Sequence, residues 1–244
     1  MKWLNIIALA AAIAVNALAN ILPINAMTTG EVAALYPNLF VPAGITFSIW
    51  SLIYMLLAGY CIYPFISENA KHAISVSGLF VVTCLLNCSW ILAWHYLFIE
   101  GSVVVMMLLL FALCVIYVKL HKSPPDSRRE KWLVYKPFSV YLGWITVATV
   151  ANITALLVHY DFSPPSPQNW MIAMAIALLL IVYLINKKFG DVAYSLVIVW
   201  ALLGIILKRT ATELQFGPIV TTCTVAIVIT LWITIHYRYR KSLT

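Results

Sequence analysis

Long apolar runs alternate with short polar interruptions along the whole chain. A helix needs about 20 apolar residues to cross the hydrocarbon core of a bilayer. Eight runs come close to this length, and charged residues, Gly or Pro separate them. They cover roughly residues 4–22, 45–65, 75–97, 101–121, 134–158, 170–186, 191–208 and 217–236. The pattern predicts an all-α fold, a polytopic membrane helix bundle with about eight transmembrane helices.

The first run also has features of a secretory signal peptide. Lys2 precedes the apolar stretch, and Ala17 and Ala19 form an A-x-A site. The apolar run continues past this site to Leu22, which favours a retained helix over a cleaved one. The next interruption, residues 23–43, is the longest loop on its side of the membrane, and residues 31–36 within it have the pattern of a short amphipathic helix.

Composition excludes a soluble protein. Hydrophobic residues make up 64% of the chain and charged residues 9%, whereas soluble domains contain about 25% charged residues. The net charge of +7 could suggest nucleic acid as a partner. The basic residues lie in short loops between apolar runs, however, so we expect membrane lipids as partners and no nucleic acid.

The distribution of Lys and Arg predicts the orientation. With the N-terminus in the cytoplasm, only Lys208 and Arg209 of the 15 basic residues fall on the opposite side. Basic residues favour the cytoplasmic side, so we expect both termini there, in a membrane of the bacterial cytoplasmic type. The cytoplasmic residues are Lys2, Lys71, Lys119, Lys122, Arg128, Arg129, Lys131, Lys136, Lys187, Lys188, Arg238, Arg240 and Lys241.

Groups for reactive chemistry are scarce within the runs. No Asp, Glu, Lys or Arg lies in the middle of one, which argues against ion-coupled transport, and Lys208 lies too near a helix end to hold retinal. His95 lies near the outer end of its run and is interpreted as a hydrogen-bonded interface residue. Cys84 and Cys88 share a helix face without further ligands in register. We therefore expect no catalytic residue, no metal and no cofactor.

Three runs carry aromatic rings and polar side chains on one helix face each. Polar groups in hydrocarbon need partners, so such faces indicate a site more than contact with lipid. If the three helix faces converge, they form a pocket for an apolar ligand with a polar edge. The alternative is that the Trp residues only pack within the bundle or lie at the membrane interface. The residues are Trp50 and Tyr54 in the second run, Asn87, Trp90 and Trp94 in the third, and Trp144 and Asn152 in the fifth.

In order and spacing, these motifs resemble the TspO/MBR family, the tryptophan-rich sensory proteins that include the mitochondrial translocator protein. The family carries Pro-Pro, then Trp and a Tyr four residues on, in its second helix, Leu-Asn-x-x-Trp in its third, and Tyr-Leu-x-Trp with an Asn eight residues after the Trp in its fifth. The matching residues here are Pro42, Trp50 and Tyr54, then Leu86, Asn87 and Trp90, then Tyr141, Leu142, Trp144 and Asn152.

The chain also departs from this pattern. Val41 replaces the first Pro, Gly44 and Ile45 stand where the family has a further Trp, and Val140 replaces a Pro before the fifth-helix Tyr. Three further runs follow the five that the resemblance covers. We therefore expect a TspO-like five-helix core, residues 1–160, and three additional transmembrane helices with a basic cytoplasmic tail, residues 161–244.

The resemblance implies a pocket covered by residues 23–43, with Trp50, Tyr54, Asn87, Trp90, Trp94, Trp144 and Asn152 as ligand-binding residues. It implies a porphyrin or sterol-like ligand, a role as sensor or translocator rather than enzyme, and either a homodimer or a dimer face occupied by the extra helices. An alternative is a transporter of a neutral small solute by alternating access, which mid-run Gly59, Gly143 and Gly204 would support only weakly. An enzyme acting on a lipid-soluble substrate is a third reading.

Overall fold

The computed structural model describes residues 1–22, 24–162, 166–211 and 217–242. Within these residues, eight helices are long and apolar enough to cross a membrane, which confirms the predicted helix bundle. They are α1 (Lys2–Ile21), α3 (Ile49–Ile66), α4 (Lys71–His95), α5 (Ile99–Leu120), α7 (Lys136–His159), α8 (Pro167–Phe189), α9 (Val192–Thr210) and α10 (Gly217–Ser242). Shorter elements are η1 (Ile24–Ala26), α2 (Thr29–Ala34), η2 (Gly44–Ser48), α6 (Arg128–Glu130) and a π-helical turn, η3 (Lys131–Tyr135).

Local capping explains where several helices begin and end. The helix expected at residues 31–36 forms as α2, slightly earlier, because Thr28 and Glu31 make a reciprocal capping box at its start. The α8 helix ends at Gly190, whose φ of 63° is the left-handed conformation that glycine adopts without strain. Asp191 follows and accepts a hydrogen bond from the Ala193 amide, which begins α9 at once.

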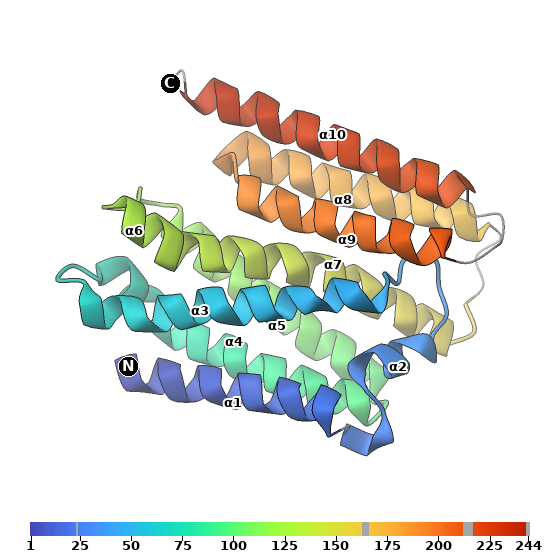
Figure 1. The fold of residues 1–244 in the computed structure, drawn as a ribbon, viewed down its shortest axis with the longest axis horizontal. Coiled ribbons are helices and arrows are strands. Elements are labelled where there is room, and N and C mark those ends of the chain that lie inside the picture. The colour runs from blue at the N-terminus through green and yellow to red at the C-terminus, as the bar shows by residue number, and fades with distance from the viewer. Residues whose placement is uncertain (23, 163–165, 212–216, 243–244) are drawn as a thin grey trace.

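The long helices lie side by side along the long axis of the molecule (Figure 1). Helices α8, α9 and α10 pack against one another on one side of the bundle, and α1 and α4 lie on the other. Between them, α7 contacts α3, α5 and α9 and is the most buried of the spans. Both termini lie at one end of the bundle and α2 at the opposite end, here called the outer end.

Two glycines bring the last three helices close to the first five. A Cβ atom at Gly143 of α7 would lie 3.0 Å from Val197 Cβ of α9. A Cβ atom at Gly204 of α9 would lie only 2.0 Å from Thr46 Oγ1 of η2, where Trp200 Nε1 also donates a 2.9 Å hydrogen bond to the Thr46 carbonyl. These glycines therefore permit close helix packing.

An ion pair joins the same two parts at the other end. Lys136 Nζ of α7 lies 2.9 Å from Asp191 Oδ1, and Tyr117 of α5 donates a 2.9 Å hydrogen bond to Asp191 Oδ2. Burial of the Asp191 carboxyl raises its pKa, but the Lys136 ammonium and the hydrogen bonds to the carboxylate lower it more, so the net pKa lies below its usual value. Asp191 thus fastens the start of α9 to the core.

Candidate functional site

The faces of α3 and α7 meet through their aromatic rings. The Trp50 ring stacks on Tyr54 at 5.5 Å between centroids, because residues four apart are neighbours on a helix. Across the helix interface, Trp50 meets Trp144 edge to face at 6.5 Å and Tyr141 at 5.9 Å. Phe47 of η2 completes the group with an edge-to-face contact to Trp144 at 5.8 Å. These offset geometries suit the quadrupoles of aromatic rings.

Helix α4 contributes a second aromatic pair and the polar contacts. Trp90 and Trp94 stack at 5.9 Å. Trp90 Nε1 donates a 2.9 Å hydrogen bond to Asn152 Oδ1 of α7, and Asn152 Nδ2 donates one of 2.9 Å to Ser102 Oγ of α5. Trp94 Nε1 donates to the carbonyl of Thr29 in α2, at 3.3 Å. Both polar atoms of the Asn152 amide therefore have partners, and the residue joins three helices.

A small cavity lies where these rings meet. Its volume is about 60 Å³ and its lining is almost entirely apolar. Trp50, Trp90, Trp94, Trp144 and Asn152 line it, so the structure brings together five of the seven residues expected from the sequence. We call this space the aromatic cavity.

The other two expected residues, Tyr54 and Asn87, lie outside the lining of the aromatic cavity. Tyr54 donates a long hydrogen bond of 3.4 Å to Asn87 Oδ1. Asn87 Nδ2 is buried and has no hydrogen-bond partner among the described residues. The pair joins α3 to α4 beside the cavity.

Four residues between α1 and α3 line the aromatic cavity at the outer end, and we call them the roof. They are Thr29 and Ala33 of α2, followed by Val41 and Pro42. His95 holds it to α4: its Nε2 lies 3.0 Å from Thr29 Oγ1 and its Nδ1 lies 3.1 Å from the Ile24 carbonyl. The interpretation of His95 as a hydrogen-bonded residue is confirmed.

A family model for TSPO-like proteins matches residues 2–237. The chain belongs to the TSPO-like protein family. The match extends past residue 160 and includes α8, α9 and most of α10. No curated protein and no solved structure matches the chain significantly. Family and fold together establish an integral, multi-pass membrane protein of the TspO type.

Other residues of the aromatic cavity in this TSPO-like protein escaped sequence reasoning. Ala148, Ala151 and Ala155 of α7 line it together with Trp144. Their spacing of four, three and four residues places them on one helix face, and their small side chains leave the space that the Trp rings surround. That spacing was readable in the sequence. The Phe47 contact was not, because Phe47 precedes α3 and reaches Trp144 only through the fold.

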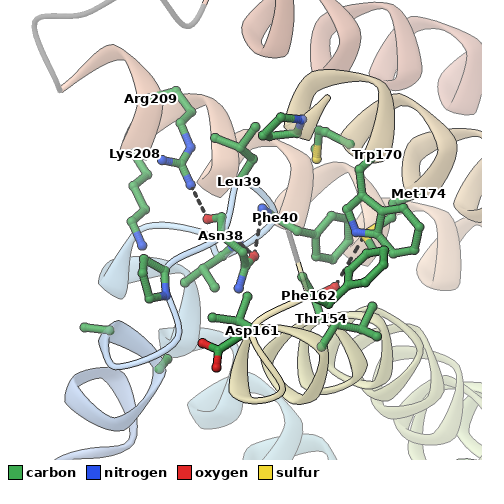
Figure 2. Close-up of a pocket in the computed structure, with 18 residues that line it drawn as sticks. Asn38, Leu39, Phe40, Thr154, Asp161, Phe162, Trp170, Met174, Lys208 and Arg209 are labelled. Atoms are coloured by element: carbon green, nitrogen blue, oxygen red, sulfur yellow. Dashed lines mark hydrogen bonds between the residues drawn. The ribbon is translucent and has the colours of Figure 1, made fainter. Parts of the chain in front are cut away.

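A larger space opens beside the roof, and we call it the outer chamber (Figure 2). Its volume is about 620 Å³. Residues of the 33–41 segment, the end of α7, the start of α8 and the end of α9 line it. Ala33 and Val41 line both the outer chamber and the aromatic cavity, so the roof separates the two spaces.

One cluster could in principle ligate a metal. His72, Asp126 and Glu130 bring one ligand atom each to within 4.8 Å of one another at the terminal end of the bundle. His72 Nδ1 lies 3.1 Å from Glu130 Oε1, and Lys71 Nζ lies 3.3 Å from Asp126 Oδ2. The Lys71 ammonium thus pairs with Asp126 and the His72 ring lies within hydrogen-bond distance of Glu130, so the cluster joins Asp126 and Glu130 to the start of α4.

Proposed function

We propose that this TSPO-like protein binds a hydrophobic, tetrapyrrole-like small molecule in the aromatic cavity and acts as a sensor or translocator. The observation that carries the proposal is the convergence of Trp50, Trp90, Trp94 and Trp144 from three helices on one space. Aromatic faces attract flat π-systems, and a dry apolar environment strengthens the few polar contacts within it.

Two hydrogen-bond donors support this proposal. Among the described residues, nothing accepts a hydrogen bond from the indole N–H of Trp50 or of Trp144; both side chains are largely buried, but neither nitrogen is itself fully buried. A ligand with a polar edge would supply acceptors for both.

The size of the aromatic cavity determines how such a ligand would enter. Pockets for drug-sized ligands have volumes of about 300–1,000 Å³, far above the 60 Å³ found here. A tetrapyrrole therefore requires the roof to move outward. The contacts of Thr29 with Trp94 and His95 are few, and each hydrogen bond contributes only about 1 kcal/mol, so ligand binding can displace them.

Quenching of tryptophan fluorescence by protoporphyrin tests the proposal. Wild-type protein in detergent should show saturable quenching, and the double variant Trp50→Ala/Trp144→Ala should lose it. Trp232→Ala is the matched control, because Trp232 is 64% exposed on α10 and far along the chain from the cavity. Undiminished quenching in the double variant would overturn the assignment of the pocket.

Uptake measurements separate the sensing role from transport. A translocator should carry labelled porphyrin into proteoliposomes, whereas a sensor should bind it without accumulation. The alternative of alternating access for a neutral solute gains little from Gly143 and Gly204, since both lie at close helix contacts rather than at breaks in a helix.

The proposal also covers the membrane in which the protein lies and its orientation there. We propose cytoplasmic N- and C-termini in a bacterial-type cytoplasmic membrane, supported by the basic residues at the terminal end of the bundle. Reporter fusions at each terminus would contradict this if either were translocated. A homodimer is also proposed, and cross-linking in native membranes tests it.

A further inference from the structure

The outer chamber lies directly against the aromatic cavity and is much the larger of the two spaces. Its volume is about 620 Å³, against about 60 Å³ for the cavity. Small-molecule sites have volumes of about 300–1,000 Å³, so the chamber has the size of a ligand site as it stands and the closed cavity does not. Only Ala33 and Val41 line both spaces, and we call this pair the shared wall.

The outer chamber presents mainly apolar surface to a ligand. Phe40, Phe162, Trp170 and Met174 are grouped along one side of it (Figure 2). The Phe162 ring meets the Trp170 ring edge to face, with 5.7 Å between their centroids. Aromatic faces and a thioether are suited to a hydrophobic ring molecule.

Most polar groups of the lining already have partners within the protein. Asn38 Oδ1 accepts hydrogen bonds of 3.0 and 3.1 Å from the amides of Phe40 and Val41. Arg209 Nη2 donates a 2.7 Å hydrogen bond to the Asn38 carbonyl, and Lys208 likewise interacts within the chain. The apolar surface, rather than these groups, therefore determines which ligand the chamber can hold.

The shared wall is held differently on its two sides. Beside Val41, the Ala43 amide donates a 2.9 Å hydrogen bond to the Gly204 carbonyl, which ties this segment to α9. Ala33 lies near the end of α2, a helix of six residues, whereas the hydrogen bonds of Thr29 to α4 are made at the start of that helix. Rotation of α2 about its start would part Ala33 from Val41 and join the two spaces.

A second space also borders the aromatic cavity, and its lining is more polar. It is a groove of about 440 Å³ that shares Thr29, Phe47 and Trp50 with the cavity. We call it the polar groove, and its other lining residues are Asn16, Asn20, Thr28, Gly30, Gly44 and Ser51. Displacing water from polar groups without new hydrogen bonds costs free energy, so a hydrophobic ligand is favoured in the outer chamber over the polar groove.

We propose that the outer chamber is the entry site for the aromatic cavity: it binds an uncharged, hydrophobic ring molecule, which then passes between Ala33 and Val41 to the Trp rings. The passage rests on the function proposed for the aromatic cavity, whereas binding in the chamber does not. Because the chamber lies outside the final site, blocking it changes the rates of entry and exit by the same factor. The affinity of the aromatic cavity stays the same.

Fluorine NMR of the full chain, labelled with 5-fluorotryptophan in nanodiscs, tests binding in the outer chamber. The probe is protoporphyrin dimethyl ester, which carries no charge, and the Trp170 signal is assigned from its loss in Trp170→Phe. In the double variant Trp50→Ala/Trp144→Ala, the ester should still shift the Trp170 signal saturably. Trp232, 64% exposed on α10, reports ester that only dissolves in the lipid. A Trp170 signal that shifts no more than that of Trp232 would overturn the proposal.

Stopped-flow quenching of tryptophan fluorescence by the same ester tests the passage. Ala34 lines the outer chamber and not the aromatic cavity, so Ala34→Phe should slow association and dissociation about tenfold each and leave equilibrium quenching unchanged. Val158→Phe blocks the chamber from α7 and should act in the same way. Gly30, one turn before Ala34, lines the polar groove and has no atom within 4 Å of an added Cβ, so Gly30→Phe is the matched control and should change neither rate.

The two experiments separate failure of the entry site from failure of the aromatic cavity. Equilibrium quenching that persists in Ala34→Phe and Val158→Phe shows that both variants fold. Normal quenching with wild-type rates in both variants, or with equal slowing in Gly30→Phe, would overturn the passage and leave the function of the cavity intact. Absence of quenching in the wild type would overturn that function and the passage with it, and the Trp170 signal then decides whether the chamber binds the ester.

Discussion

The aromatic cavity and the outer chamber lie on two sides of one roof but are built differently. Helix faces make the aromatic cavity: its Trp rings and small Ala side chains repeat at helical spacing, and both polar atoms of the Asn152 amide have partners. Helix ends and a loop make the outer chamber, with charges at its edge. Side chains on a continuous helix are positioned by its periodicity, whereas residues at helix ends are brought together only by the path of the chain.

The two spaces also depend on different helices. The aromatic cavity needs α3, α4 and α7 in contact, and none of its lining residues lies on α8, α9 or α10. The outer chamber needs the outer end of α9 held against the 33–41 segment. Changes that loosen α9 should therefore affect the outer chamber first.

The largest effect should follow from Asp191→Asn, at the other end of α9. This change leaves the largely buried Lys136 ammonium without its counter-charge and should lower the free energy of unfolding by about 3 kcal/mol. Denaturant titration measures the loss. Porphyrin quenching should be retained, since no lining residue of the aromatic cavity lies on α8, α9 or α10; a loss of quenching would contradict the independence of the two spaces.

The same residue predicts a pH dependence. A carboxyl group whose pKa is lowered in the folded state stabilises the protein at pH values above its unfolded pKa of about 3.9. That contribution is lost as the pH falls through the lower, folded value. The melting temperature of the wild type should therefore drop below about pH 4, and Asp191→Asn should show a smaller drop over the same range.

An intermediate effect is expected from Gly204→Ala, where the new Cβ atom would lie 2.0 Å from Thr46 Oγ1. Overpacking of this kind costs roughly 2 kcal/mol, and the shift should disturb both spaces because η2 carries Phe47 while α9 carries Arg209. Thr46→Ala in the same chain should restore much of the stability. Gly30→Ala, with no atom within 4 Å of the added Cβ, is the control.

The smallest effect should follow from Asn152→Leu, which removes the partners of Trp90 Nε1 and Ser102 Oγ. Hydrogen bonds between helices in membranes contribute about 0.6–2 kcal/mol, so we expect a loss near 1 kcal/mol together with weaker porphyrin quenching. Thr149→Val provides the control, since among the described residues the Thr149 hydroxyl bonds only to the Ile145 carbonyl of its own helix.

Much of the helix bundle and part of the site were readable from the chain. The eight apolar runs became eight helices because hydrocarbon requires every backbone polar group to be paired within its own segment. Trp50, Trp90, Trp94, Trp144 and Asn152 were found because helical spacing places each set on one face. Tyr54 and Asn87 share those faces and still lie outside the cavity lining, because a helix face is wider than the space that it borders.

Sequence alone thus determined the spans, the family motifs and the helix faces on which the aromatic side chains lie. Each of these depends on local helical periodicity and on the hydrocarbon that surrounds the helices. Tertiary structure alone decided the volume of the aromatic cavity, the role of Gly143 and Gly204 as contact points, and the existence of the outer chamber. Those features depend on distances between residues such as Asn38 and Arg209, which lie 171 positions apart in the chain. No local rule sets such distances; the packing of the whole bundle does.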